Sequence, residues 1–170
     1  MKKVMSLSVL FSLFMLVACG GGDNKKEEKE TMKIGSQKTE TAQDTNSATL
    51  ALSGNDMMQF DKNELKVKAG QEVTLNFRHI GKLDKKVMGH NFVLLQPGTD
   101  IQEFSMKASE AGEALDWIPE EGKEVLVHTK MLGGGESTSI TFTAPAAGTY
   151  DFICSFPGHS AMMKGKFIVE

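Results

Sequence analysis

Three residues with metal-binding side chains follow one another at short spacing near the end of the chain. Cys154, His159 and Met163 are separated by four residues and then by three. Thiolate and thioether sulfur select soft metals, and imidazole suits copper, zinc or iron. Two His and one Cys in a trigonal plane, with a weak axial Met, form an electron-transfer copper site. The stretch therefore predicts three ligands of such a site, which needs a second His from elsewhere in the chain.

The best placed second His is His90, which follows Gly89 and opens an apolar run at 91–95. A His after a turn and at the start of a strand has its ring aimed by the fold. Gly89 also lets the backbone approach a ligand closely, and its carbonyl could serve as a weak axial group. The remaining His, His79 and His128, lie within expected strands, where an imidazole is more often a packed or surface side chain. We expect neither of them to bind the metal.

The N-terminus has the pattern of a secretory signal peptide. Lys2 and Lys3 precede an apolar run of about 14 residues, shorter than the roughly 20 that a membrane span needs. The run ends in Leu-Val-Ala followed by Cys19, which resembles the lipobox of bacterial lipoproteins. That resemblance implies removal of residues 1–18 and acylation of the Cys19 thiol; an ordinary signal peptide is the alternative. With Cys19 acylated, Cys154 has no partner for an intramolecular disulfide.

Residues 19–47 are predicted to be a disordered tether that begins with the lipidated Cys. The tract from Gly20 is charged and then rich in Thr, Ser, Gln and Asn, with too few apolar residues to offset the entropy of ordering. Its charged cluster resembles export signals of some surface-exposed lipoproteins, and a solvated spacer is an equal alternative. The formal charge of −3, which becomes more negative without Lys2 and Lys3, gives no reason to expect nucleic-acid binding.

Residues 48–170 have the pattern of one all-β domain. Short apolar or alternating segments are separated by turns that contain Gly or Pro, which indicates a β-sandwich or barrel. The eight predicted strands are 49–53, 65–69, 73–77, 91–95, 125–128, 139–142, 150–154 and 165–169. One segment differs, because residues 100–111 carry apolar side chains at helical spacing and are followed by Gly112. We expect a short helix there, inserted between two strands.

Four blocks of this domain resemble azurin, a blue-copper cupredoxin. The spacing is specific, since plastocyanin and pseudoazurin have two residues between Cys and His, and the copper-A domain of oxidases has two Cys in this loop. The resemblance covers residues 48–170 and implies an eight-stranded Greek-key cupredoxin fold. The blocks lie at 54–60, 87–91, 127–130 and 154–165.

Carried over residue by residue, the azurin pattern implies a complete type 1 copper site. The equatorial ligands would be His90, Cys154 and His159, with Met163 and the Gly89 carbonyl as weak axial groups. Around them, Asn91 would bridge to the Cys154 loop and Phe156 would help to stiffen it. An apolar docking patch for redox partners would consist of Met58, Leu83, Met88, Phe156, Pro157 and Met162.

Two further positions are informative in the light of this resemblance. His79 is similar to a buried azurin His whose protonation is linked to the oxidation state, so it is a candidate pH modulator. Trp117, the single Trp, falls in a predicted loop, and we expect that its indole is not deeply buried.

The function that the resemblance implies is one-electron transfer by a membrane-anchored copper protein that is not an enzyme, with copper cycling between Cu(I) and Cu(II). Expected partners are c-type cytochromes, a nitrite reductase or a peroxidase, and the expected location is the bacterial cell envelope, at the periplasmic face or the outer surface. We expect a monomer. The alternatives are a copper-sequestering or surface-interaction lipoprotein on the same fold, and a structural zinc domain, for which Met would be a poor ligand.

Overall fold

The computed structural model describes residues 46–119 and 122–170. The predicted signal peptide at 1–18 and the predicted tether at 19–47 lie outside these residues, except that the first strand already begins at Ser47. Within the described residues, every helix is too short or too polar to cross a membrane.

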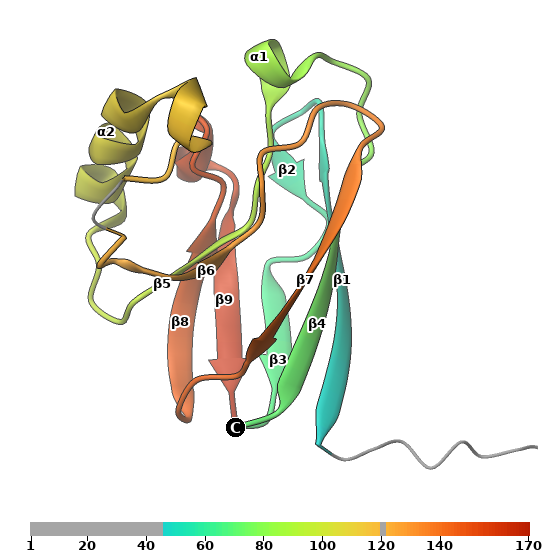
Figure 1. Cartoon of the computed structure of the whole chain (residues 1–170), viewed down its shortest axis with the longest axis vertical. Helices are drawn as coiled ribbons and strands as arrows, with labels where there is room; N and C mark the ends of the chain where they lie inside the picture. The colour runs from blue at the N-terminus through green and yellow to red at the C-terminus, as the bar shows by residue number, and fades with distance from the viewer. Residues whose placement is uncertain (1–45, 120–121) are drawn as a thin grey trace, which may run out of the picture. The chain divides into compact units, whose positions relative to one another are not determined.

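Two mixed β-sheets face each other (Figure 1). The first has the order β2-β1-β4-β7, and β1 runs parallel to β4. Its strands alternate because one face is buried: Val73, Leu75 and Phe77 of β4 point into the core, and the residues between them are more exposed. The bounds are β1 (Ser47–Asn55), β2 (Gln59–Phe60), β4 (Glu72–His79) and β7 (Ser137–Thr143).

The second sheet has the order β3-β9-β8-β5-β6. Its inner strand β5 is buried on both faces, which explains why its sequence is uniformly apolar rather than alternating. The bounds are β3 (Glu64–Val67), β5 (Val93–Leu95), β6 (Val125–His128), β8 (Gly148–Ile153) and β9 (Lys164–Val169).

The predicted all-β sandwich is confirmed, and each of the eight predicted strands is present within the described residues. A ninth, β2, is a two-residue strand that pairs antiparallel with the end of β1. It was not predicted because two residues are too few to show alternation. The turn before it contains Met58 with a positive φ of 55°, a conformation that a pattern of side chains does not reveal.

The predicted helix at 100–111 is also confirmed, as α2 (Ile101–Ala111). It begins at Asp100, whose carboxylate accepts hydrogen bonds from the N–H groups of Gln102 and Glu103. It ends at Gly112, which has a φ of 71°. Shorter turns of helix are α1 (Lys85–Met88), η1 (Glu113–Leu115) and η2 (His159–Ala161).

The expectation for Trp117 is wrong. The side chain lies in a loop, as predicted, but it is only 8 % exposed and packs in a second apolar cluster beneath α2, with Phe104, Ala108 and Ile153. A turn at Asp116 and Trp117, with φ of 50° and 55°, folds the chain back and buries the indole. Left-handed conformations of non-Gly residues cost about 1–3 kcal/mol each and are retained where the surroundings impose them.

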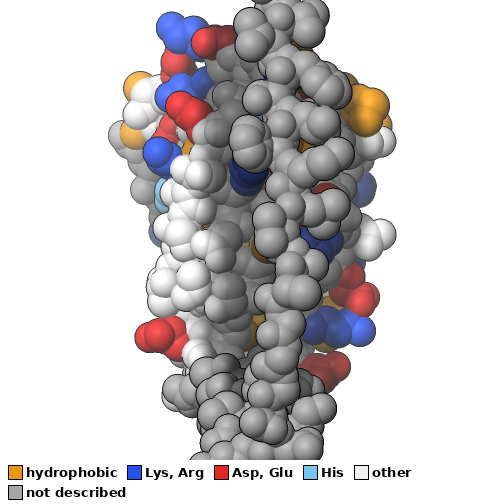
Figure 2. Space-filling model, turned by 90° about the vertical axis from the view of Figure 1, so that its right-hand side faces the viewer, with side chains coloured by type: hydrophobic (Ala, Val, Ile, Leu, Met, Phe, Trp, Pro, Cys, Tyr) orange, Lys and Arg blue, Asp and Glu red, His pale blue; other side chains and the backbone are white. Residues whose placement is uncertain are grey.

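The exposed surface of the first sheet is mainly uncharged. Figure 2 shows charged and hydrophobic side chains near the two ends of the molecule, and a largely white region of polar side chains and backbone along the middle of one flank. The residues of β7 that are most exposed are Ser137, Ser139, Thr141 and Thr143. Among the described residues, the group that could hold a metal ion does not include a residue of these exposed β7 positions.

Candidate metal centre

Three of the predicted ligands meet in the structure. Sγ of Cys154 lies 3.9 Å from Nδ1 of His90 and 3.7 Å from Nδ1 of His159. All three side chains are buried, and their donor atoms lie within 4.8 Å of one another. His90 follows α1, whereas Cys154 follows β8 and His159 begins η2. His90 precedes β5 and Cys154 follows β8, and these two strands pair antiparallel in the second sheet, so the set exists only when segments distant in the chain have paired.

The spacing of these donors fits a metal ion. Metal–sulfur bonds of about 2.3 Å and metal–imidazole bonds of about 2.0 Å, at about 120° to one another, place sulfur and nitrogen about 3.7 Å apart. The distances of 3.7 and 3.9 Å in the structure are close to this value. One thiolate and two imidazoles are a donor set that suits copper.

A backbone carbonyl orients the His90 ring. Its Nε2 lies 2.8 Å from the carbonyl oxygen of Asn55, at the end of β1. Since a carbonyl can only accept, Nε2 carries the proton and donates it, and Nδ1 keeps its lone pair for the metal. The backbone of His90 is fixed as well, because its N–H and C=O both pair with Leu132.

The two predicted axial groups also lie at the site. Met163 is fully buried, and the carbonyl oxygen of Gly89 lies 3.7 Å from Sγ of Cys154. Gly54 makes room for them: a Cβ on this residue would lie 2.9 Å from the His90 ring and 3.1 Å from the terminal methyl group of Met163. Any side chain at position 54 would therefore displace a ligand.

Burial keeps the ligands neutral in the metal-free protein. It raises the pKa of the Cys154 thiol to about 12, although backbone hydrogen bonds oppose this shift. Burial also lowers the pKa of His159 to about 4, and it lowers the pKa of His90. At neutral pH both imidazoles are therefore ready to bind, and metal binding must displace one proton from the thiol.

Asn91 links the two halves of the site, as predicted. Its Nδ2 donates to Oγ of Ser155 at 2.7 Å, and its Oδ1 accepts from the Ser155 N–H at 2.9 Å. This pair of bonds ties the residue after His90 to the residue after Cys154. Such contacts hold ligands in their binding orientation.

We predict that Asn91→Ala weakens both the fold and the metal site. The variant leaves the buried N–H and hydroxyl of Ser155 without these partners, which lowers the free energy of unfolding by about 1–3 kcal/mol. Copper affinity should fall by about 10- to 100-fold. Urea unfolding of the metal-free protein and competition with a chelator measure the two effects. Asn76→Ala, at an exposed position of β4, is the matched control; equal copper affinity in both variants would contradict the prediction.

His79 and His128 do not belong to the group of donor residues found at the site. His79 is buried and stacks on His90, with ring centroids 4.2 Å apart. The Gly81 N–H donates to its Nδ1 at 3.0 Å, so its Nε2 donates to the Met88 carbonyl at 2.7 Å. The proposed link between His79 protonation and oxidation state stays a prediction. His128 is exposed on β6.

The predicted docking residues are all at least partly exposed. Met162 is 57 % exposed, and Leu83 and Pro157 are exposed as well. Met58, Met88 and Phe156 are partly buried. Sequence reasoning did not select Met57 and Val87, which are exposed large apolar residues next to predicted members of the patch. The role of the patch in docking stays a prediction.

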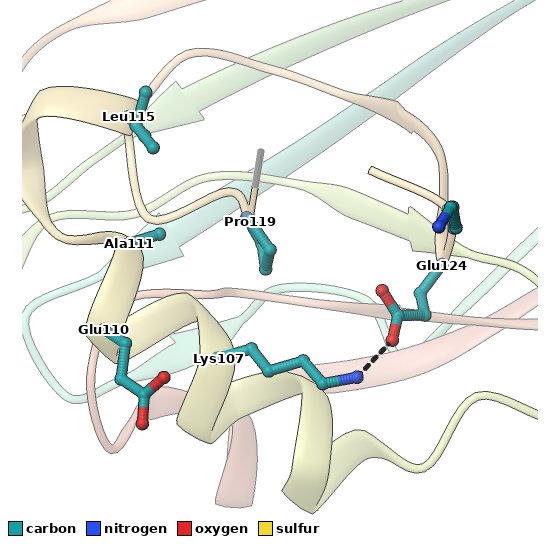
Figure 3. A pocket seen from close by; sticks show the side chains of 7 residues that line it. Lys107, Glu110, Ala111, Leu115, Pro119 and Glu124 are labelled. Carbon is teal, nitrogen blue, oxygen red and sulfur yellow. Dashed lines mark hydrogen bonds and ion pairs between the residues drawn. The ribbon is translucent and has the colours of Figure 1, made fainter. Parts of the chain in front are cut away.

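One hollow in the described surface lies away from the metal ligands. It has a volume of about 630 Å³ and is bounded by α2 and the segment after it (Figure 3). Lys107 extends across the hollow to Glu124, with Nζ and Oε1 2.7 Å apart, and it also pairs with Glu103. The Lys107 ammonium group is therefore paired with two carboxylates.

Sequence reasoning missed two functional positions, Gly54 and Asn55. Neither carries a ligand side chain: Gly54 acts by having none, and Asn55 acts through its backbone carbonyl. The azurin-like block at 54–60 begins with both residues and could have drawn attention to them. Their roles become clear only when the fold places the His90 ring beside them.

The fold and the site together define a β-sandwich metalloprotein with a buried Cys, two His and a Met from one end of the sandwich. Residues 42–170 match the model of the copper binding proteins, plastocyanin/azurin family. The chain belongs to this family. Its cofactor is copper, held in a type 1 site by His90, Cys154, His159 and Met163.

Similar proteins agree with this assignment. The chain is 47 % identical to azurin of Bordetella pertussis over 118 residues. This alignment covers 67 % of this chain and 78 % of that protein. It is 34 % identical to auracyanin-A of Chloroflexus aurantiacus over 178 residues, and this alignment covers 99 % of this chain and 97 % of that protein. The solved structure of auracyanin A, a "blue" copper protein from that bacterium, has a TM-score of 0.68 at 33 % identity and covers 73 % of this chain and 99 % of its own.

Proposed function

We propose that the protein is a membrane-anchored one-electron carrier. When bound, copper supplies reversible one-electron chemistry between Cu(I) and Cu(II). The observation that carries the proposal is the arrangement of Cys154, His90 and His159. Their donor atoms are buried, and their separations are those expected for ligands of one metal ion.

Residues 154–163, which carry three of the ligands and are called the ligand loop below, have little freedom to rearrange. The Cys154 N–H donates to the Met163 carbonyl at 3.0 Å, and the Met163 N–H donates to the His159 carbonyl at 2.8 Å. Pro157 has a fixed φ and restricts the loop between the ligands. Ligands that cannot move far keep the same geometry in both oxidation states, which lowers the barrier to electron transfer. Four side-chain ligands would leave the metal no coordination position for a substrate, which favours a carrier over an enzyme.

Electrons would leave and enter through His159. This residue is 3 % exposed, its ring packs against that of Phe156, and its carbonyl accepts from the Met162 N–H; both neighbours are members of the predicted patch. An apolar, Met-containing surface adapts to more than one partner and suits a small, short-lived interface. Partner classes that fit are c-type cytochromes, a nitrite reductase or a peroxidase, each meeting a monomeric carrier.

The N-terminal sequence supports anchoring by lipid. The lipobox-like Leu-Val-Ala before Cys19 and the polar tract that follows would hold the domain in the cell envelope, on the periplasmic face or at the outer surface. A Cys19→Ser variant should no longer incorporate labelled fatty acid and should leave the membrane fraction. Unchanged labelling would remove the anchor from the proposal.

Electron self-exchange of the copper-loaded protein tests the carrier function. We expect fast exchange in the native protein and an exchange rate at least tenfold lower in Met162→Lys, because the new charges repel one another where two patches meet. The control is Leu126→Lys, on β6 outside the patch. Slow native exchange together with ready loss of copper to a modest chelator would instead indicate a copper-sequestering protein.

A further inference from the structure

Trp117 occupies a strained turn at the end of the helical insertion. Asp116 and Trp117 both have positive φ, a conformation that bulky residues adopt only when packing or hydrogen bonding imposes it. The turn is held by the Trp117 N–H, which donates to the Gly112 carbonyl at 2.9 Å, and by the Asp116 N–H, which donates to the Glu113 carbonyl at 3.1 Å. Packing and hydrogen bonds therefore hold Asp116 and Trp117 in an unfavourable backbone conformation, and this conformation keeps the indole in place.

The indole faces the ligand loop. Its ring centroid lies 5.0 Å from that of Phe156, at an interplanar angle of 49°. The Phe156 ring in turn lies 4.6 Å from the His159 ring, at 40°. A continuous row of three rings therefore runs from the helical insertion to a copper ligand.

His159 depends on this packing more than His90 does. The Nε2 of His90 donates to the Asn55 carbonyl, whereas among the described residues no hydrogen-bond partner is found for Nε2 of His159. Its ring touches Phe156 on one side and His90 on another, with a centroid distance of 5.1 Å to the latter. The orientation of the His159 ring is thus set by aromatic contacts.

A second contact joins the helical insertion to the same loop. The hydroxyls of Ser105, in α2, and Ser160, in η2, lie 2.7 Å apart, and Ser105 donates to the Ile101 carbonyl at 2.6 Å. The Ser105 hydroxyl is also the donor to Ser160, so its single proton is shared between the two acceptors. The insertion therefore holds the loop on both sides of His159, at Phe156 and at Ser160.

We propose that Trp117 is a positioning residue for the copper site, and that the α2 insertion supports the ligand loop through it. The indole fixes the Phe156 ring, which limits rotation of His159 and displacement of the 156–163 loop. The inference rests on the proposed function, because Trp117 positions His159, the ligand through which we propose that electrons pass. A Trp that merely fills the second apolar cluster would stabilise the fold without affecting the loop in particular.

Comparison of Trp117→Ala, Trp117→Phe and Phe104→Leu tests the proposal in the full-length chain. Phe104 is 1 % exposed and belongs to the same apolar cluster, but no ring contact joins it to Phe156, so its variant controls for general loss of stability. Amide hydrogen exchange of the metal-free protein is followed at His159, Met162 and Met163, whose N–H groups close the loop. Copper release to a chelator and the copper(II) hyperfine splitting are measured in the loaded protein.

We expect Trp117→Ala to speed loop exchange and copper release at least tenfold and to change the hyperfine splitting. Trp117→Phe should restore most of these properties, because a ring remains beside Phe156, and Phe104→Leu should leave them within about twofold of the native protein. Equal effects of Trp117→Ala and Phe104→Leu, after allowance for their unfolding free energies, would overturn the proposal. If Trp117→Ala does not fold, the same comparison is made with Trp117→Leu. The exchange data do not depend on electron transfer, so slow self-exchange of a native protein that binds copper would count against the proposed function and not against this inference.

Discussion

Replacing Cys154 by Ser will abolish the intense visible absorption of the copper-loaded protein. That absorption arises from charge transfer between a thiolate and copper, and a serine hydroxyl is a harder, neutral donor that gives no such band. The two imidazoles and the thioether that remain lack the one anionic ligand of the set. We therefore expect a colourless protein that loses copper to chelators under conditions in which the native protein keeps it.

The fold should survive this substitution, which makes the result interpretable. Cys and Ser are nearly isosteric, and the serine hydroxyl can donate to the Gly89 carbonyl that now lies 3.7 Å from Sγ. The expected cost in unfolding free energy is about 1–3 kcal/mol for placing a hydroxyl in a buried site. Absorption spectroscopy after copper loading, with circular dichroism to confirm folding, measures both. Met162→Leu, at an exposed position of the same loop, is the control that should stay blue; a blue Cys154→Ser variant would mean that the ligand sulfur has been misassigned.

Acid should destabilise the metal-free protein through its two ligand histidines. Burial lowers the pKa of His159 from 6.5 to about 4 and also lowers that of His90. Below pH 6.5 the unfolded chain therefore binds protons that the folded chain does not, so the free energy of unfolding falls as the pH falls. For His159 alone the loss accumulates between pH 6.5 and pH 4 and reaches about 3 kcal/mol, at about 1.4 kcal/mol per pKa unit.

Urea unfolding of the metal-free protein at a series of pH values measures this slope. A His159→Gln variant cannot take up the proton and should lose stability less steeply, by about 1.4 kcal/mol per pH unit near pH 5. If the native protein and His159→Gln had the same slope over this range, the buried His159 would not be the source of the acid sensitivity.

The strands and the long helix could be predicted because each depends on a local pattern. Alternation in 73–77 and helical spacing in 100–111 follow from which face of the element is buried. By contrast, the pairing of β1 with β4 in parallel depends on contacts between segments distant in the chain, and nothing in either segment specifies its neighbour.

The ligand side chains could be predicted because metal chemistry limits the residue types. Cys154, His159 and Met163 lie close together in the chain, so their spacing alone restricts the kind of site. Trp117 shows the limit of this reasoning: a loop position indicated exposure, but the left-handed turn that buries the indole has no side-chain signature.

By itself, the sequence determined the chemistry of this protein: a soft-metal donor set, a second His selected by its place between a turn and a strand, and a strand pattern for a sandwich. Only the tertiary structure decided how those donors are held. The proton on His90 is placed by the Asn55 carbonyl, room for the ligands comes from the missing side chain of Gly54, and His159 is supported by a Trp from a distant insertion through Phe156. The reason is physical, since a ligand is identified by its side chain, whereas its orientation depends on backbone groups and rings that the fold brings to it.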